Sequence, residues 1–106
     1  MNFWNIVLTP EAAEDIKNIY DYISGNLKNH SAVKKQVEKI IDCLHSLEMM
    51  PLRYSLYEKE PWKSRGLRKV GVGNFMIFYL AENITNNIVV LRVLYSGRDI
   101  DSVFKA

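Results

Sequence analysis

The sequence has a single cysteine and no long apolar run, and both shortages exclude whole classes of protein. Cys43 has no partner for an internal disulfide, which fits a reducing compartment. No window approaches the roughly 18 consecutive apolar residues of a membrane helix, and the N-terminus lacks a basic stretch followed by an apolar core. We therefore expect a cytoplasmic protein with no membrane partner.

Residues for metal or cofactor chemistry are equally scarce. His30 falls in the link between two predicted helices and His45 beside the apolar stripe of the second, so neither is placed as a general acid or base. No group of side chains has metal-ligand spacing, and Gly71-Val72-Gly73 precedes a predicted strand rather than the helix that a dinucleotide site needs. The sequence predicts no metal and no cofactor.

The remaining composition is that of a soluble globular protein. The 106 residues are 48% hydrophobic and 25% charged, so we expect a single domain over residues 1–106. The net charge is only +2, but charge is segregated: residues 11–48 hold seven acids against five lysines, and residues 63–98 hold six basic residues against one acid. Such segregation is expected where one surface meets an anionic partner.

Hydrophobic periodicity predicts an α+β fold. An apolar run at 3–8 predicts a strand, and Thr9-Pro10 is a helix-entry signature before a helix over residues 10–24, with Gly25-Asn26 as its stop. A second amphipathic helix follows a cap at Asn29 or Ser31 and is ended by Pro51. The two helices are expected to form an antiparallel hairpin.

The second half of the chain is predicted to form mainly strands. Residues 52–66 have no clean period and predict an ordered loop. Three β-rich runs, at 67–72, 75–80 and 88–95, predict an antiparallel meander, and a short helical turn follows from Asp99. The predicted architecture is an N-terminal strand and a two-helix hairpin packed on a mainly antiparallel sheet with a C-terminal three-strand meander.

Arg92 interrupts the apolar run of the last predicted strand. Strand alternation divides this run between one face with Arg92, Ile88, Val90 and Leu94 and another, expected to pack on the helices, with Val89, Leu91, Val93 and Tyr95. A charge inside a sheet is costly unless it is paired or solvated. Two interpretations stay open: a face that binds a partner, or a structural ion pair with Glu82 or Asp99.

More cations flank the meander. Arg65, Arg68 and Lys69 lead into its first strand and Arg98 follows its last, so an antiparallel arrangement could gather them at one edge of the sheet. Arginine suits phosphate and carboxylate because its fork is planar and always charged, and nearby aromatic side chains add stacking. The alternative is a solvated basic rim without a ligand.

Three segments in this order resemble the RelE/ParE superfamily of bacterial toxins: LTPEAAED (8–15), LRKV with VGNFMIFY (67–79), and VLRVLYSGRD (90–99). The resemblance covers nearly the whole chain and implies the toxin half of a type II toxin-antitoxin pair. Its partner is then a cognate acidic antitoxin that folds on the toxin as an amphipathic helix and an extended segment, which gives a hetero-oligomer.

The superfamily has two working modes, and the first is RelE-like. These toxins are metal-independent endoribonucleases that cut ribosome-bound mRNA, and their pattern has an arginine in the middle strand, another after the last strand, and a tyrosine or histidine near the C-terminus. Arg98 matches the second position, whereas Met76 and Phe104 occupy the first and third. The replacements that the chain offers are Arg68 or Lys69 for the cation and Tyr95 or Asp99 for proton transfer.

The second mode is ParE-like: the toxin poisons DNA gyrase by docking and needs no hydrolytic residues. The long hairpin, with IYDYI at 19–23, and the basic tail are similar to this branch, which the resemblance therefore favours. Candidate residues for binding the target or antitoxin are Arg65, Arg68, Arg92, Arg98 and Phe104. A third hypothesis is a non-toxic nucleic-acid or protein binding module.

Overall fold

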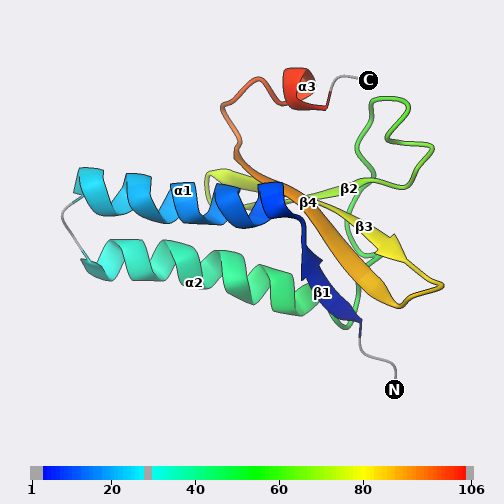
Figure 1. Cartoon of the computed structure of the whole chain (residues 1–106), viewed down its shortest axis with the longest axis horizontal. Coiled ribbons are helices and arrows are strands. Elements are labelled where there is room, and N and C mark those ends of the chain that lie inside the picture. Colours follow the sequence, from blue (N-terminus) through cyan, green and yellow to red (C-terminus); the bar gives the residue numbers. More distant parts are fainter. Residues whose placement is uncertain (1–3, 28–29, 105–106) are drawn as a thin grey trace.

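The computed structural model describes residues 4–27 and 30–104, with residues 22–27 and 30–33 described through their backbone only. The elements along the chain are β1 (Asn5–Leu8), α1 (Pro10–Leu27), α2 (His30–Leu47), β2 (Arg68–Val72), β3 (Phe75–Glu82), β4 (Asn87–Tyr95) and α3 (Ile100–Val103) (Figure 1). The strands form one sheet in the order β1-β4-β3-β2, in which β1 is parallel to β4 and the other pairs are antiparallel. The predicted α+β fold is confirmed.

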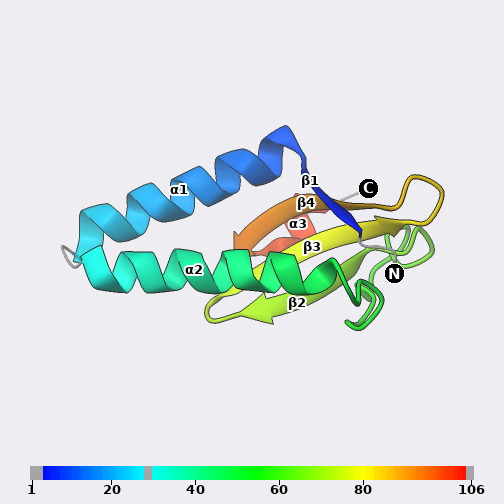
Figure 2. The same cartoon turned by 90° about the horizontal axis from the view of Figure 1, so that it is seen from below.

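The sheet separates two apolar cores. The hairpin of α1 and α2 covers one face, where Ile19 and Ile40 meet Ile77 and Val90 (Figure 2). This core forms because apolar residues recur at helical spacing on both helices and therefore line the sides that face the sheet.

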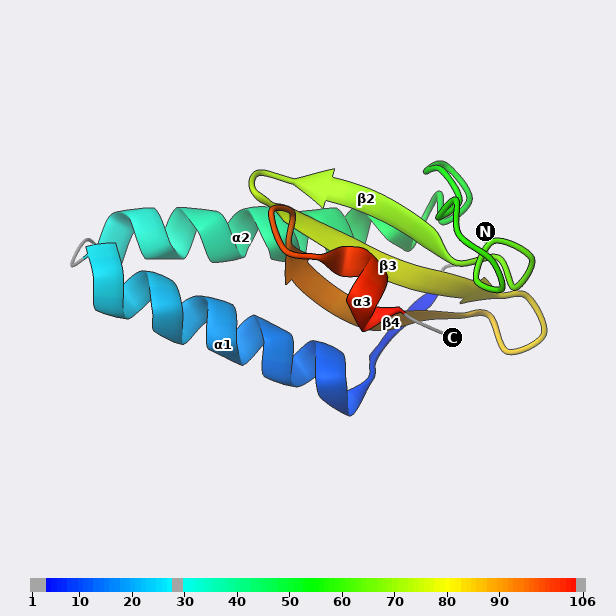
Figure 3. The ribbon, with the colours of Figure 1, turned by 90° about the horizontal axis from the view of Figure 1, so that it is seen from above.

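The opposite face of the sheet is covered by the C-terminal segment and the long loop before β2. Figure 3 shows α3 lying over β3 and β4. Here the ring of Phe104 packs against Phe78, with a centroid separation of 4.7 Å, and against Tyr57 and Trp62, each at 5.6 Å. The indole of Trp62 also donates a hydrogen bond to the Phe104 carbonyl, so the end of the chain is fastened to the loop.

Two helix boundaries differ from the sequence prediction. Helix α1 continues to Leu27 and passes through Gly25-Asn26, the predicted stop. A glycine inside a helix costs only about 1 kcal/mol relative to alanine, so it weakens an established helix but does not end it. Helix α2 begins at His30, so Ser31 lies inside it and is not its cap, and the alternative cap Asn29 lies outside the described residues. The helix ends at Leu47, before Pro51, as predicted.

A β-bulge in β4 overturns the predicted division of its side chains. Phe78 pairs with Arg92, but the next residue of β3, Tyr79, pairs with Val90, which leaves Leu91 as an extra residue in β4. A bulge of this kind bends the strand and breaks the two-residue alternation of side chains.

The bulge explains which side chains the prediction misplaced. Ile88 and Val90, which we expected opposite the helices, pack in the helix-side core together with Val93. Leu91, which we expected to face the helices, packs with Leu94 in the core under α3. Strict alternation holds on each side of the bulge and fails across it.

Gly73 offers a test of the fold, because its φ is +58° and a Cβ there would lie 3.0 Å from Gln36 Nε2. Gly66, with φ +86°, has open space around it. We expect Gly66→Ala to destabilise the protein by about 1 kcal/mol through backbone strain alone, and Gly73→Ala by more. Urea unfolding measures the free energy of unfolding of both variants. Equal losses of stability would show that the Gln36 side chain moves away from the new Cβ at no energetic cost.

Two tyrosines predict a loss of stability at alkaline pH. Burial, with a hydrogen bond to Asp101 and nearby acids, raises the pKa of Tyr57 from 10.0 to about 12, and burial raises the pKa of Tyr79 to about 12. Between these values the unfolded chain releases protons that the folded chain retains, so stability falls as pH rises from 10 to 12. In urea titrations the Tyr57→Phe, Tyr79→Phe double variant should show a shallower fall; an equal slope would contradict these pKa shifts.

Candidate functional site

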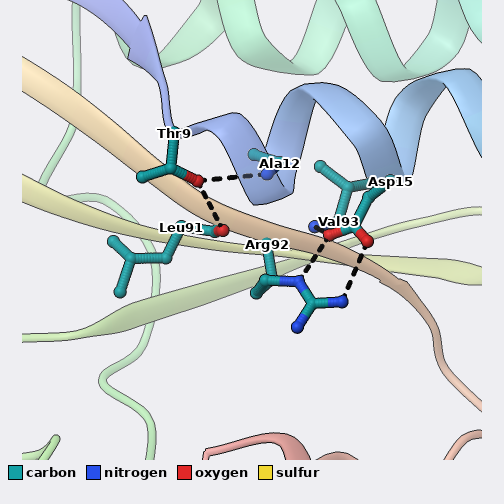
Figure 4. A network of polar contacts seen from close by, with 6 residues as sticks. All are labelled: Thr9, Ala12, Asp15, Leu91, Arg92 and Val93. Carbon is teal, nitrogen blue, oxygen red and sulfur yellow. Dashed lines mark hydrogen bonds and ion pairs between the residues drawn. The ribbon is translucent and has the colours of Figure 1, made fainter.

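The start of α1 is tied to the bulge in β4. The hydroxyl of Thr9 accepts a hydrogen bond from the Ala12 amide at 3.1 Å, which caps the helix, and donates to the Leu91 carbonyl at 2.8 Å (Figure 4). The Thr9 amide donates to the Val90 carbonyl at 3.0 Å. The predicted cap therefore also holds α1 against the sheet.

Asp15 of α1 makes a further contact with β4, beyond the point where β1 ends. Its carboxylate accepts a hydrogen bond from the Val93 amide at 3.0 Å. It also accepts hydrogen bonds from Nε and Nη2 of Arg92, at 2.7 and 2.9 Å (Figure 4). Because β1 stops at Leu8, the outer edge of β4 has no neighbouring strand at Val93. The carboxylate of Asp15 takes the place of that strand's carbonyl oxygen.

Arg92 thus forms a structural ion pair, one of the two interpretations that the sequence left open, but its partner is Asp15 and not Glu82 or Asp99. Its side chain is 24% exposed and that of Asp15 is 10% exposed. The hydrogen bond with Asp15 is the main cause that raises the pKa of Arg92, and the charge of Glu11 adds to it. Because the Asp15 carboxylate already neutralises this guanidinium, Arg92 would add little to the affinity for an external anion, and a binding role for it stays a prediction.

The cations around the start of β2 hold the long loop in place. Arg68 donates from Nη1 to the Tyr54 carbonyl at 2.6 Å, and Lys69 Nζ lies 2.8 Å from a carboxylate oxygen of Glu58. Arg65 is exposed, with its guanidinium 5.3 Å from the Trp62 ring centroid.

Arg98 is the exception among the predicted arginines. It is exposed, and within the described chain its side chain has no hydrogen bond or ion pair. Its amide donates to the Tyr95 carbonyl, and Tyr95 is 57% exposed with its ring packed edge-on against Phe75. Tyr95 and Arg98 therefore share the end of the sheet near the β2–β3 turn, where the Ser96 amide bonds Asn74.

The structure does not bring the predicted catalytic residues together. Arg68 pairs with Tyr79 of β3, whereas Tyr95 pairs with Phe75, four residues away along the same strand. At the strand rise this is about 13 Å. Arg68 and its neighbour Lys69 lie toward one end of the sheet and Tyr95 and Arg98 at the other, so the cations do not share an edge.

The two positions where the sequence departs from the RelE-like pattern both face the core under α3. Met76 packs against this core, and Phe104 is only 7% exposed. A buried ring cannot stack on a partner, so the structure gives no support to the predicted contact of Phe104 with a target or antitoxin.

Sequence reasoning missed Asp15, although a signal for it exists. Asp15 lies three residues after Ala12 and four before Ile19, both buried, so it falls on the apolar stripe of α1. A carboxylate on a buried stripe needs a partner, and the search for one leads to Arg92.

Neither a metal centre nor a membrane span is found in the part of the chain that the structure describes. No group of three or more histidine, cysteine, aspartate or glutamate residues there could hold a metal ion. No helix there is both long and apolar enough to cross a bilayer.

Comparison with known proteins matches one family model and a group of solved structures that includes two from toxin-antitoxin systems. The model of the ParE toxin of the type II toxin-antitoxin system parDE matches residues 6–100. A chain from the chromosomal ParDE system of P. aeruginosa superposes with a TM-score of 0.70 at 20% identity, over 88% of this chain and 96% of that one. A chain from the RelBE2 toxin-antitoxin complex of Mycobacterium tuberculosis gives 0.65 at 18%, over 90% and 93%. Among curated protein sequences there is no match.

The Asp15–Arg92 pair generates a prediction for stability. Asp15→Ala should destabilise the protein by about 3 kcal/mol, because it leaves a largely buried guanidinium and the Val93 amide without their acceptor. A double-mutant cycle with Arg92→Ala should give a coupling of about 1–3 kcal/mol. The control is the exposed pair His45–Glu48, whose cycle should give less than about 0.5 kcal/mol. Equal couplings in urea unfolding would contradict a special role for Asp15.

Proposed function

The chain belongs to the ParE toxin family of type II toxin-antitoxin systems, and from this premise we propose that it arrests bacterial growth by docking on DNA gyrase rather than by cutting RNA. It would act in the cytoplasm and be held inactive by a cognate acidic antitoxin. The similar chains from P. aeruginosa and M. tuberculosis come from ParDE and RelBE2 systems, which supports an antitoxin as partner.

The distance between the strand positions of the candidate catalytic residues is the observation that supports this proposal. Cleavage of RNA by its own 2′-hydroxyl needs proton transfer and charge stabilisation at one phosphate, within hydrogen-bond reach of each group. Arg68 and Tyr95 lie at positions about 13 Å apart along the sheet. Lys69 is also engaged by Glu58. A docking toxin needs no such cluster.

Surface features of the helical hairpin also favour docking. The hairpin extends beyond the sheet (Figures 1 and 2) and carries two large exposed side chains, Tyr20 at 50% and Ile41 at 42%. Exposed apolar side chains on rigid helices are a common means of binding another protein.

A ribonuclease remains the second candidate because of Tyr95 and Arg98. Both are exposed at the same end of the sheet, and a phenol and an unpaired guanidinium are groups that can donate a proton and stabilise an anion. The other two candidate cations, Arg68 and Lys69, pair with Tyr79 and Phe78 of β3, whereas Tyr95 pairs with Phe75, so we rank this function behind docking.

Induced expression of the full chain in bacteria without the antitoxin tests the proposal. We expect growth arrest with accumulation of gyrase-linked broken DNA and intact transcripts in the same cells. Cleavage sites mapped inside translated messages would instead establish the ribonuclease. Unimpaired growth would favour a non-toxic binding module.

Arg98 gives the sharpest single-residue prediction. Arg98→Ala should reduce toxicity strongly, with less than about 0.5 kcal/mol change in stability, because the side chain is exposed and has no hydrogen bond or ion pair within the described chain. Lys39→Ala removes a charge that is also exposed, from α2, and should leave toxicity unchanged. Colony counts after induction compare the two at matched protein levels; full toxicity of Arg98→Ala would remove Arg98 from the site.

A further inference from the structure

The loop that follows α2 exposes apolar side chains close together in the sequence. Met49, Met50 and Leu52 are 61%, 58% and 56% exposed, and we call these three residues the loop patch. The patch follows the end of α2, beside the start of β1 (Figure 2). Large apolar side chains that are exposed so close together in the sequence indicate a site of interaction.

The backbone that carries the loop patch is held in place at four carbonyl groups. The Glu48 carbonyl accepts the Trp4 amide, and the Pro51 carbonyl accepts the buried hydroxyl of Tyr79 at 2.6 Å. Two residues of β2 donate further on, Arg68 to the Tyr54 carbonyl and the Lys69 amide to Ser55. A loop fixed before binding loses little conformational entropy when a partner arrives.

The loop patch is followed in the sequence by a cation, Arg53, whereas the acid that precedes it, Glu48, lies 2.9 Å from Nδ1 of His45. The nearest cation is Arg53, exposed and 5.4 Å from the Tyr54 ring centroid, and no acid occurs between residues 49 and 57. This charge favours an acidic partner.

We propose that the loop patch and Arg53 bind the apolar face of an acidic amphipathic segment of the antitoxin. The inference rests on the proposed function, because the antitoxin is the partner. A polypeptide fits better than a nucleic acid because methionine and leucine lack the flat ring on which bases stack. Methionine is also adaptable, and its thioether packs well against the aliphatic side chains of a helix.

Titration of the isotope-labelled full chain with synthetic peptides, followed by amide chemical shifts, tests this proposal. The probe is an amphipathic peptide of leucine and glutamate. A matched peptide of leucine and lysine and a single-stranded oligothymidylate are titrated separately, to test whether a basic peptide or a nucleic acid binds the patch instead. We expect the glutamate peptide alone to shift the amides of residues 48–56.

Matched variants locate the contact. The triple variant Met49→Gln, Met50→Gln, Leu52→Gln should bind the glutamate peptide at least tenfold more weakly, and Arg53→Glu should slow association most at low salt. Ile84→Gln changes a wholly exposed isoleucine in the β3–β4 turn and should bind as the unchanged chain does. Because all these side chains are exposed, unchanged thermal unfolding verifies that each variant is folded.

Several outcomes overturn the proposal. They are unchanged affinity in the triple variant, equal binding of the lysine peptide, shifts at the patch caused by the oligothymidylate, or burial of the patch by a second copy of the chain. A chain that arrests growth but fails these tests refutes the docking site alone. A chain that passes them without arresting growth refutes the proposed toxicity and leaves the docking site standing.

Discussion

The open edge of β4 is the constraint on which the rest of the structure depends. The chain must leave β1 at Leu8 to enter α1, because Thr9-Pro10 favours a helix start, and β4 then continues beyond its neighbour. Asp15 resolves this by accepting the Val93 amide and the side chain of Arg92. One carboxylate thus provides the acceptor for an edge amide of the sheet, pairs the charge of Arg92 and connects α1 of the hairpin to β4.

This use of charge inside the fold determines what remains for a partner. Arg92 is paired with Asp15, and Arg68 and Lys69 bind the loop before β2. The basic segment of the sequence is therefore largely a set of structural contacts, and Arg98 is the predicted arginine left exposed and without a partner in the described chain. This dispersal of the candidate catalytic groups is the reason why we propose docking over cleavage.

The order of elements could be predicted from the sequence because each element has a local signal. Helical spacing marked the hairpin, and turn residues such as Gly73 marked the meander. The bulge at Leu91 could not be predicted, since it arises from the register between two strands. The partner of Arg92 lies 77 residues away and became visible only when α1 was placed beside β4. Asp15 itself was within reach of sequence reasoning, because it interrupts an apolar stripe.

The central claim is that the protein acts by docking on its target and carries no cleavage chemistry of its own. Incubation of the purified chain with gyrase, plasmid DNA and ATP, in parallel with translating ribosomes on a defined mRNA, tests it most directly. The account predicts that covalent gyrase–DNA complexes accumulate in the first reaction while the mRNA in the second stays intact. Cut mRNA at the ribosome, with gyrase turning over normally, would contradict it.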